Sequence, residues 1–171
     1  MRNSIKRLTA CLALTLVLVL ALGSTAFATT AQYRSTQNFL DFLDGKGIKY
    51  TYVGVVDTDI ERVNVSYTLD NFASLQCSIF FKSDCEEVSL RIWNIIKAKA
   101  GKSLITATLN ELNADYKFVK YVYDESDSTV QAEVDQYIDG DHCGRSVYDS
   151  MMVMFREVDN NEIAAKIKSL E

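Results

Sequence analysis

The sequence predicts an α+β fold, a two-layer sandwich in which helices pack on one face of an antiparallel sheet. Alternating apolar and polar residues, typical of strands with one buried face, recur through the middle of the chain. Segments with helical spacing of apolar residues come before, between and after these strands. The length of 171 residues suits one globular domain. We expect the element order α-β-β-β-β-α-β-β-α.

The first helix is expected to begin at a cap on Ser35 or Thr36 and to end before Gly45. Small polar residues favour helix N-termini, and glycine favours helix ends. Three of its apolar residues share one face: Phe39, Leu40 and Leu43. A strand rich in tyrosine and valine follows at 50–56, and the acidic residues at 57–59 indicate a turn.

Strict alternation predicts three more strands, at 62–68, 75–82 and 87–93. The residues that alternate inward are Val63, Val65, Tyr67, Leu75, Cys77, Ile79, Phe81, Val88, Leu90 and Ile92. A turn at 83–84 pairs Cys77 with Leu90. Cys77 is therefore expected among the inward residues, as a free buried thiol.

A second helix, capped by Ser103, is expected to run through Leu112, and a second hairpin follows it. A two-residue turn at 126–127 pairs bulky residues on one face. These pairs are Tyr123–Val130, Tyr121–Ala132 and Val119–Val134. The last helix has a stripe of apolar residues, namely Val147, Met151, Met154, Phe155 and Val158. The polar residues at 159–161 kink or break it before a short amphipathic helix.

The amino terminus has the three parts of a secretory signal peptide. Basic residues come first, the apolar run from Leu8 to Leu22 follows, and Ala26-Phe27-Ala28 matches a cleavage site. The apolar run is shorter than the ~20 residues that a bilayer core requires. We expect cleavage after Ala28 and a secreted or extracytoplasmic protein.

Composition limits the chemistry that the chain can perform. The single histidine, His142, excludes sites built from two histidines, such as H-E-x-x-H zinc sites. Loss of the signal peptide lowers Lys+Arg from 18 to 15 against 23 Asp+Glu, which changes the net charge from −5 to −8. Such a surface disfavours nucleic acid and anionic lipid. We expect no nucleic-acid partner, no cofactor and no stable membrane insertion after cleavage.

The segment from Asp139 to Gly144 is the main candidate for chemistry. His142 and Cys143 are adjacent in sequence, and sequence neighbours rarely face each other as a base and a nucleophile must. The segment also imitates a calcium loop, but Cys143 replaces one Asp or Asn ligand and Ser150 replaces the bidentate glutamate. We expect a strand-to-helix loop and no catalytic, cofactor-binding or metal-binding residue. A small-ligand or metal sensor is one alternative, and an enzyme with a site near Cys143 and His142 is another.

Three cysteines belong to the expected mature chain: Cys77, Cys85 and Cys143. Export permits disulfides, but an odd count leaves at least one thiol unpaired. The predicted hairpin separates Cys77 from Cys85 by ~17 Å, beyond the ~7 Å limit for a bridge. Cys85 and Cys143 are the better candidates for any bridge.

Apolar and aromatic residues also fall on the polar face of the predicted sheet. Scattered apolar residues on a sheet face are common, but aromatic side chains also anchor protein interfaces. We therefore hypothesise an interaction face that mediates association with a partner or a second copy. Its candidate residues are Phe80, Arg91, Trp93, Phe118, Val122 and Tyr137.

The segment from Leu109 to Phe118 is the most distinctive in the chain. Two asparagines three residues apart end a helix, and a Tyr-Lys-Phe sequence opens a strand. The residues of this structural motif are Asn110, Asn113, Tyr116 and Phe118. We expect Asn113 to adopt a left-handed conformation or to donate hydrogen bonds to unpaired backbone carbonyls at the helix end. We expect Asn110 to form a hydrogen bond with the following loop.

Together with the segments at 71–81 and 88–95 and the acidic turn after Tyr123, this motif resembles the YbjN-like family of bacterial proteins. The resemblance spans about residues 35 to 170. It implies a fold similar to that of type III secretion chaperones, and members have been called bacterial sensory transduction regulators. It carries over no catalytic residue.

These observations divide the chain into a signal peptide at 1–28, a disordered mature N-terminus at 29–34 and a YbjN-like domain at 35–171. The expected function is that of a secreted, non-enzymatic domain that binds a protein or peptide in a chaperone-like or regulatory role. A homodimer is one form that this association can take.

Overall fold

The computed structural model describes residues 30–171, so the predicted signal peptide and its cleavage site lie outside the described residues. The helices are α2 (Arg34–Lys46), α3 (Lys102–Asp115), α4 (Gly144–Val158) and α5 (Asn161–Lys168). The strands are β1 (Thr51–Asp57), β2 (Ile60–Tyr67), β3 (Leu75–Lys82), β4 (Glu87–Lys97), β5 (Lys120–Asp124) and β6 (Thr129–Tyr137). This is the predicted element order, with the last helix broken in two at Asp159 and Asn160.

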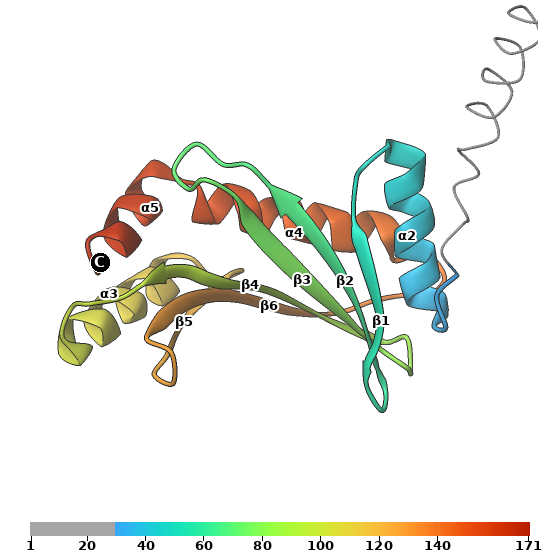
Figure 1. Ribbon diagram of the computed structural model, residues 1–171, viewed down its shortest axis with the longest axis horizontal. Helices are drawn as coiled ribbons and strands as arrows, with labels where there is room; N and C mark the ends of the chain where they lie inside the picture. The colour runs from blue at the N-terminus through green and yellow to red at the C-terminus, as the bar shows by residue number, and fades with distance from the viewer. Residues whose placement is uncertain (1–29) are drawn as a thin grey trace, which may run out of the picture.

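The six strands form one antiparallel sheet in the order β1-β2-β3-β4-β6-β5, so β1 and β5 are its edges. Helices α4 and α5 lie above the sheet in Figure 1, α2 stands at the right against α4, and α3 lies beside β5. The predicted α+β architecture is confirmed. Within residues 30–171, no helix combines the length and hydrophobicity that crossing a bilayer requires.

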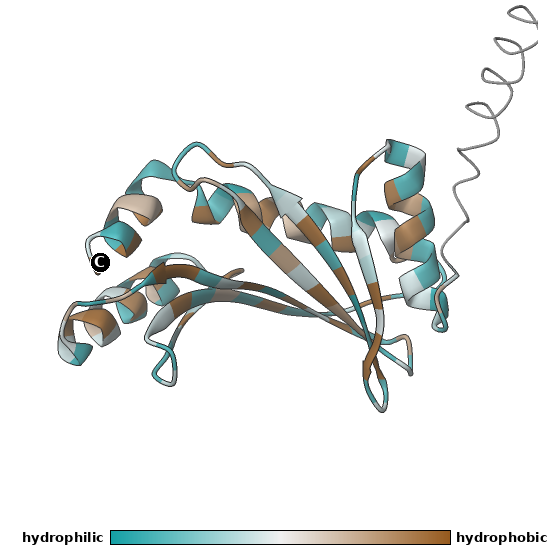
Figure 2. Ribbon diagram, in the orientation of Figure 1, coloured by the Kyte–Doolittle hydropathy of each residue, from teal (hydrophilic) through white to brown (hydrophobic). Residues whose placement is uncertain are grey.

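The core fills the space between the helices and the side of the sheet that they cover, which we call the inner face. Hydrophobic and hydrophilic residues alternate along the strands (Figure 2), and the hydrophobic set points inward. Phe39 of α2 meets Phe81 of β3 with ring centroids 5.5 Å apart, and both side chains are fully buried. Side chains from all four helices belong to this one cluster.

The β3–β4 hairpin has a different register from the one expected. Cys77 pairs with Ile92, and Phe81 pairs with Val88, because the connection contains four residues rather than two. Its Cys85 adopts a φ of 61°, in the left-handed region. The shift is two residues, which equals the period of a strand, so every side chain keeps its predicted face.

The second hairpin follows the predicted register. Tyr123 pairs with Val130, and Tyr121 pairs with Ala132. Strand β5 begins only at Lys120, however, so Phe118 precedes the strand instead of opening it. Parity therefore does not place Phe118 on the sheet.

The start of the domain is held by a buried carboxylate rather than by the expected caps. Helix α2 begins at Arg34, and the cap position belongs to Tyr33. Glu61, fully buried in β2, accepts hydrogen bonds from the backbone N–H groups of Gln32 (2.7 Å) and Tyr33 (3.0 Å) and from the Tyr52 hydroxyl. The expectation of disorder at 29–34 is therefore wrong for residues 32–34.

Burial alone would raise the pKa of Glu61, but the hydrogen bonds from Tyr52 and the backbone outweigh it and lower that pKa. Burial, together with the same contact, raises the pKa of Tyr52 to about 12, so its hydroxyl stays a donor. Gln32 and Tyr33 immediately precede α2, so the charged carboxylate lies near the helix N-terminus, where the helix dipole favours negative charge.

Candidate interaction face

The opposite side of the sheet, which we call the outer face, carries the residues that alternate outward. They form rows across the strands, because opposite residues share a register. One row reads Asn64, Ser78, Arg91, Glu133 and Lys120, and the next reads Arg62, Phe80, Ser89 and Asp135. Phe80, Arg91, Trp93, Val122 and Tyr137 all belong to outward positions, as parity predicts.

Two aromatic side chains meet on this face. The rings of Phe80 (β3) and Trp93 (β4) lie 5.5 Å apart between centroids with an interplanar angle of 60°. Trp93 is nevertheless 41% exposed. Ser78 is only 2% exposed although it points outward, and its hydroxyl donates to Asn64 Oδ1 (2.9 Å). Neighbouring side chains on this face therefore cover Ser78 and leave Trp93 open to solvent.

Arg91 lies at the centre of the outer face and is bound by its neighbours. Its guanidinium donates to the backbone carbonyls of Leu90 (2.9 Å) and Val134 (3.1 Å) and to Asp135 Oδ1 (2.8 Å). Glu133 completes the ion-pair network at 3.7 Å. Arg91 therefore tethers β4 to β6 and is not a free cation for an anionic ligand.

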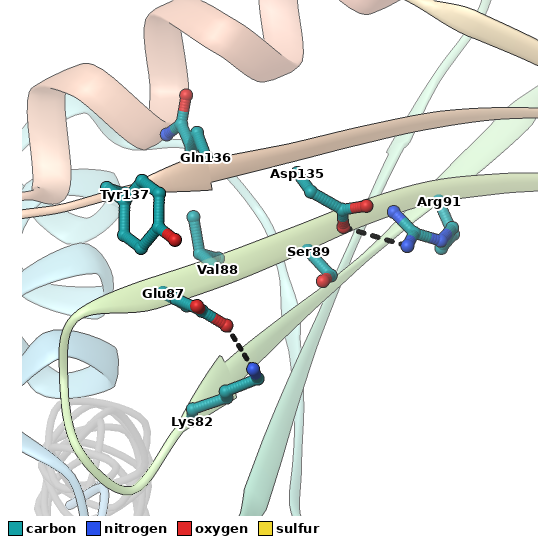
Figure 3. A pocket seen from close by; sticks show the side chains of 8 residues that line it. All are labelled: Lys82, Glu87, Val88, Ser89, Arg91, Asp135, Gln136 and Tyr137. Atoms are coloured by element: carbon teal, nitrogen blue, oxygen red, sulfur yellow. Dashed lines mark hydrogen bonds and ion pairs between the residues drawn. The ribbon is translucent and has the colours of Figure 1, made fainter.

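A hollow of about 340 Å³ adjoins Arg91 at the start of β4 (Figure 3). Its charged walls are paired, Lys82 with Glu87 and Arg91 with Asp135. Burial alone would raise the pKa of Asp135, but hydrogen bonds from Ser89 and Arg91 lower it. Tyr137 at the rim is 83% exposed, so this hollow offers an aromatic edge between two ion pairs.

A second hollow of about 260 Å³ lies on the other side of Arg91 along β4. It is lined by Trp93, Asn94, Asp124, Asp127 and Gln131. The register between β4 and β6 shifts between Ile92 and Ile96, and Asn94 takes a φ of 55° within that shift. A bulge of this kind re-aims side chains beside it.

Sequence analysis missed this second hollow. The sequence predicts only a turn at 126–127, and alternation does not reveal a bulge in the partner strand. The one available signal is that Asp124 continues the outward parity of Val122. The hydroxyl and backbone N–H of Ser126 donate to Asp124 Oδ1 and lower the pKa of Asp124.

The asparagine motif has a structural role that differs from the expected one. Asn113 stays within α3 and pairs with the edge strand β5: its Nδ2 donates to the Tyr121 carbonyl (2.9 Å), and its Oδ1 accepts from the Tyr121 N–H (2.7 Å). The side chain thus occupies the place of a neighbouring strand. Asn110 is exposed on α3, and Tyr116 ends the helix with its N–H bonded to the Leu112 carbonyl.

The loop around His142 and Cys143 is bound to α2. Asn38 donates to the Asp141 carbonyl (2.9 Å) and accepts from the Gly144 N–H (2.7 Å), while Arg34 pairs with Asp141 (2.9 Å). Cys143 is buried and free, and burial raises its pKa to about 11. A buried thiol of this kind is a poor nucleophile.

The other two thiols are also free and buried, and burial raises the pKa of Cys77 to about 12. In the described part of the chain, no three His, Cys, Asp or Glu residues are grouped so that they could hold a metal ion.

Comparison with known proteins relates the chain to two solved structures. No family model matches the sequence, and no curated protein matches it. The chain is similar to the ExsC–ExsE complex, with a TM-score of 0.45 and 11% identity over 78% of this chain and 95% of that chain. It is also similar to YbjN from E. coli, with a TM-score of 0.41 and 14% identity over 76% of this chain and 90% of that chain.

Proposed function

We propose that this protein binds another protein or a peptide through the outer face of its sheet. The observation that carries the proposal is the contact of Phe80 with Trp93 on a face that the helices leave uncovered. Tryptophan is among the residues that contribute most to binding energy at protein interfaces. A 41% exposed tryptophan at the centre of a sheet therefore suits a docking surface better than a solvent-facing role.

The surroundings of the aromatic pair also suit recognition of a chain-like partner. Hollows lie on both sides of Arg91 along β4, so the binding surface extends over several strands. The hydrogen bonds of Arg91 to β6 make this surface rigid before a partner arrives. A pre-organised surface loses less conformational entropy on binding.

The proposed role is binding without catalysis, outside the cytoplasm. The extracytoplasmic location rests on the signal-like segment at 1–28. The burial of Cys143 and the hydrogen bonds of its loop favour a structural role for this segment. Binding in a chaperone-like or regulatory role is the function that these features support.

Affinity capture with matched variants tests this proposal. The mature chain, its Trp93→Ser variant and a Leu104→Ser variant are used as bait in the culture that produces the protein. Leu104 is a suitable control because it is 55% exposed on α3, outside the six strands that form the outer face. We expect wild type and Leu104→Ser to retain the same stoichiometric partner and Trp93→Ser to lose it. Equal retention by all three baits contradicts the proposal.

Self-association through the same face is tested separately by light scattering. If a second copy is the partner, the mass of the wild-type protein is that of a dimer and Trp93→Glu reduces it to that of a monomer. A dimer that survives Trp93→Glu places the contact elsewhere and contradicts this use of the face.

A further inference from the structure

The two hollows of the outer face differ in their electrostatics. In the first, each charged side chain has an opposite partner in the same hollow (Figure 3). The second contains two carboxylates, Asp124 and Asp127, and no basic residue. Its other walls are the amides of Asn94 and Gln131 and the ring of Trp93.

Local hydrogen bonds hold these carboxylates in place but use only one oxygen of each. Asp124 Oδ1 accepts from the N–H and hydroxyl of Ser126, and Asp127 Oδ1 accepts from those of Thr129. Within residues 30–171, neither Oδ2 takes part in a hydrogen bond or ion pair that would neutralise it. Each carboxylate therefore keeps one oxygen for a ligand.

Three basic side chains near this part of the sheet are engaged elsewhere, and a fourth, Lys97, lies opposite Thr129 but does not line the hollow. Arg91 binds Asp135 and the backbone of β6, and Lys102 pairs with Glu125 (2.7 Å). Lys120 donates to the carbonyl of Asn113 (3.4 Å) at the sheet edge. Within residues 30–171, no ion pair joins Asp124 or Asp127 to a basic side chain, and the net charge of the full chain is −5.

From this charge pattern we infer that the outer face binds a basic peptide segment, with an arginine or lysine side chain in the hollow beside Trp93. The inference deepens the proposed function, on which it rests. Tryptophan is the best aromatic partner for a cation over its ring, and two carboxylates at the rim add charge complementarity. The Phe80–Trp93 contact then provides apolar surface for the flanking residues of the same peptide.

A peptide suits this surface better than a free organic cation. Trp93 both lines the hollow and contacts Phe80, so a bound cation has an apolar surface next to it. A free cation would leave that surface exposed, whereas a peptide with alternating apolar and basic residues covers both. Trp93 is also the only tryptophan in the chain, so its fluorescence reports directly on this site.

The test is a fluorescence titration of the mature protein with two blocked peptides that contain no aromatic residue. One peptide alternates leucine with arginine, and the other replaces each arginine with citrulline, which has nearly the same shape but no charge. We expect the arginine peptide to shift the Trp93 emission and to bind about tenfold tighter than the citrulline peptide. Its affinity should fall as salt is added, since the site is solvent-accessible.

Two double variants distinguish the charge of the second hollow from the net charge of the protein. Asp124→Asn with Asp127→Asn keeps the oxygens that accept the turn hydrogen bonds, so the hairpin is expected to fold. Asp57→Asn with Asp59→Asn makes the same charge change in the β1–β2 hairpin, whose turn contains no tryptophan. We expect the first pair to weaken binding of the arginine peptide about tenfold and the second to change it less than about twofold.

The outcomes distinguish the inference from the function on which it rests. Equal binding of both peptides overturns the basic partner and leaves peptide binding by the outer face in place. Equal weakening by both double variants overturns the hollow as the site, because net charge alone then explains the effect. If neither peptide changes the emission, the inference is wrong, and the capture experiment with Trp93→Ser judges the proposed function independently.

Discussion

Phe80 and Phe81 are consecutive residues of one strand, and each meets another aromatic ring at a centroid distance of 5.5 Å. Phe81 contacts Phe39 inside the core, where both rings are fully buried. Phe80 contacts Trp93 on the outer face, where Trp93 is open to solvent. The same kind of aromatic contact therefore stabilises the fold on the inner face and offers a surface for binding on the outer face.

The two edges of the sheet also differ, because a side chain covers one of them. Asn113 pairs with both backbone groups of Tyr121 and thereby closes part of the β5 edge. The β1 edge has three exposed valines, Val53, Val55 and Val56. Among the described residues, no side chain pairs with the backbone of β1 as Asn113 pairs with β5. Two register irregularities and the φ of 86° at Gly54 interrupt this strand, a feature that limits unwanted strand pairing.

The first prediction compares the two phenylalanines directly. Phe81→Ala should lower the free energy of unfolding by about 3–5 kcal/mol, because it leaves a cavity in a packed core. Phe80→Ala should cost about 1 kcal/mol, because its ring is only partly buried and loses mainly its contact with Trp93. Denaturant titrations of both variants measure the difference. Similar losses of stability in the two variants would contradict the distinction between a packed inner face and an open outer face.

The second prediction concerns Glu61, a fully buried carboxylate on the inner face of β2. Glu61→Gln should cost about 1–3 kcal/mol at neutral pH, because the amide cannot satisfy the same backbone donors as a carboxylate. The pKa of Glu61 is lowered in the folded protein, so its contribution is present above the unfolded pKa near 4.5 and is lost as pH falls through the folded value. Unfolding titrations between pH 7 and pH 3 should show the wild type and variant converging in acid. A constant difference would contradict the assigned role.

The third prediction separates the two asparagines of α3. Asn113→Ala should cost about 1–3 kcal/mol, because the Tyr121 N–H and carbonyl lose their partner at the β5 edge. Asn110→Ala, one turn earlier and exposed, should change stability by less than about 0.5 kcal/mol. Amide hydrogen exchange at Tyr121 should rise in the first variant alone. Unchanged exchange there would mean that the side chain does not cover the edge.

The last prediction is that Trp93→Ser has only a small effect on stability. An exposed residue on an open face contributes little to folding, so we expect a loss below about 1 kcal/mol despite the size of the side chain. Thermal unfolding followed by circular dichroism measures it. A large loss would assign Trp93 to the stable part of the fold and would weaken its role in binding.

Strand patterning was sufficient to predict both faces of the sheet. Phe80 and Trp93 were placed outward correctly even though the hairpin register was two residues off, since the face of a side chain depends only on parity. The second hollow could not be predicted, because the left-handed Asn94 and the register shift of β4 leave no mark in the alternation. Glu61 and Asn113 could not be assigned either, because their partners lie 28 and 8 residues away and meet them only in the folded chain.

Hydroxyl-radical footprinting of the captured complex tests the central claim most directly, since it measures which side chains a partner covers. We predict that oxidation of Trp93 and Tyr137 slows on complex formation, while oxidation of Leu104 on α3 is unchanged. Trp93 that oxidises as fast in the complex as in the free protein would contradict the account, because the partner would then bind elsewhere.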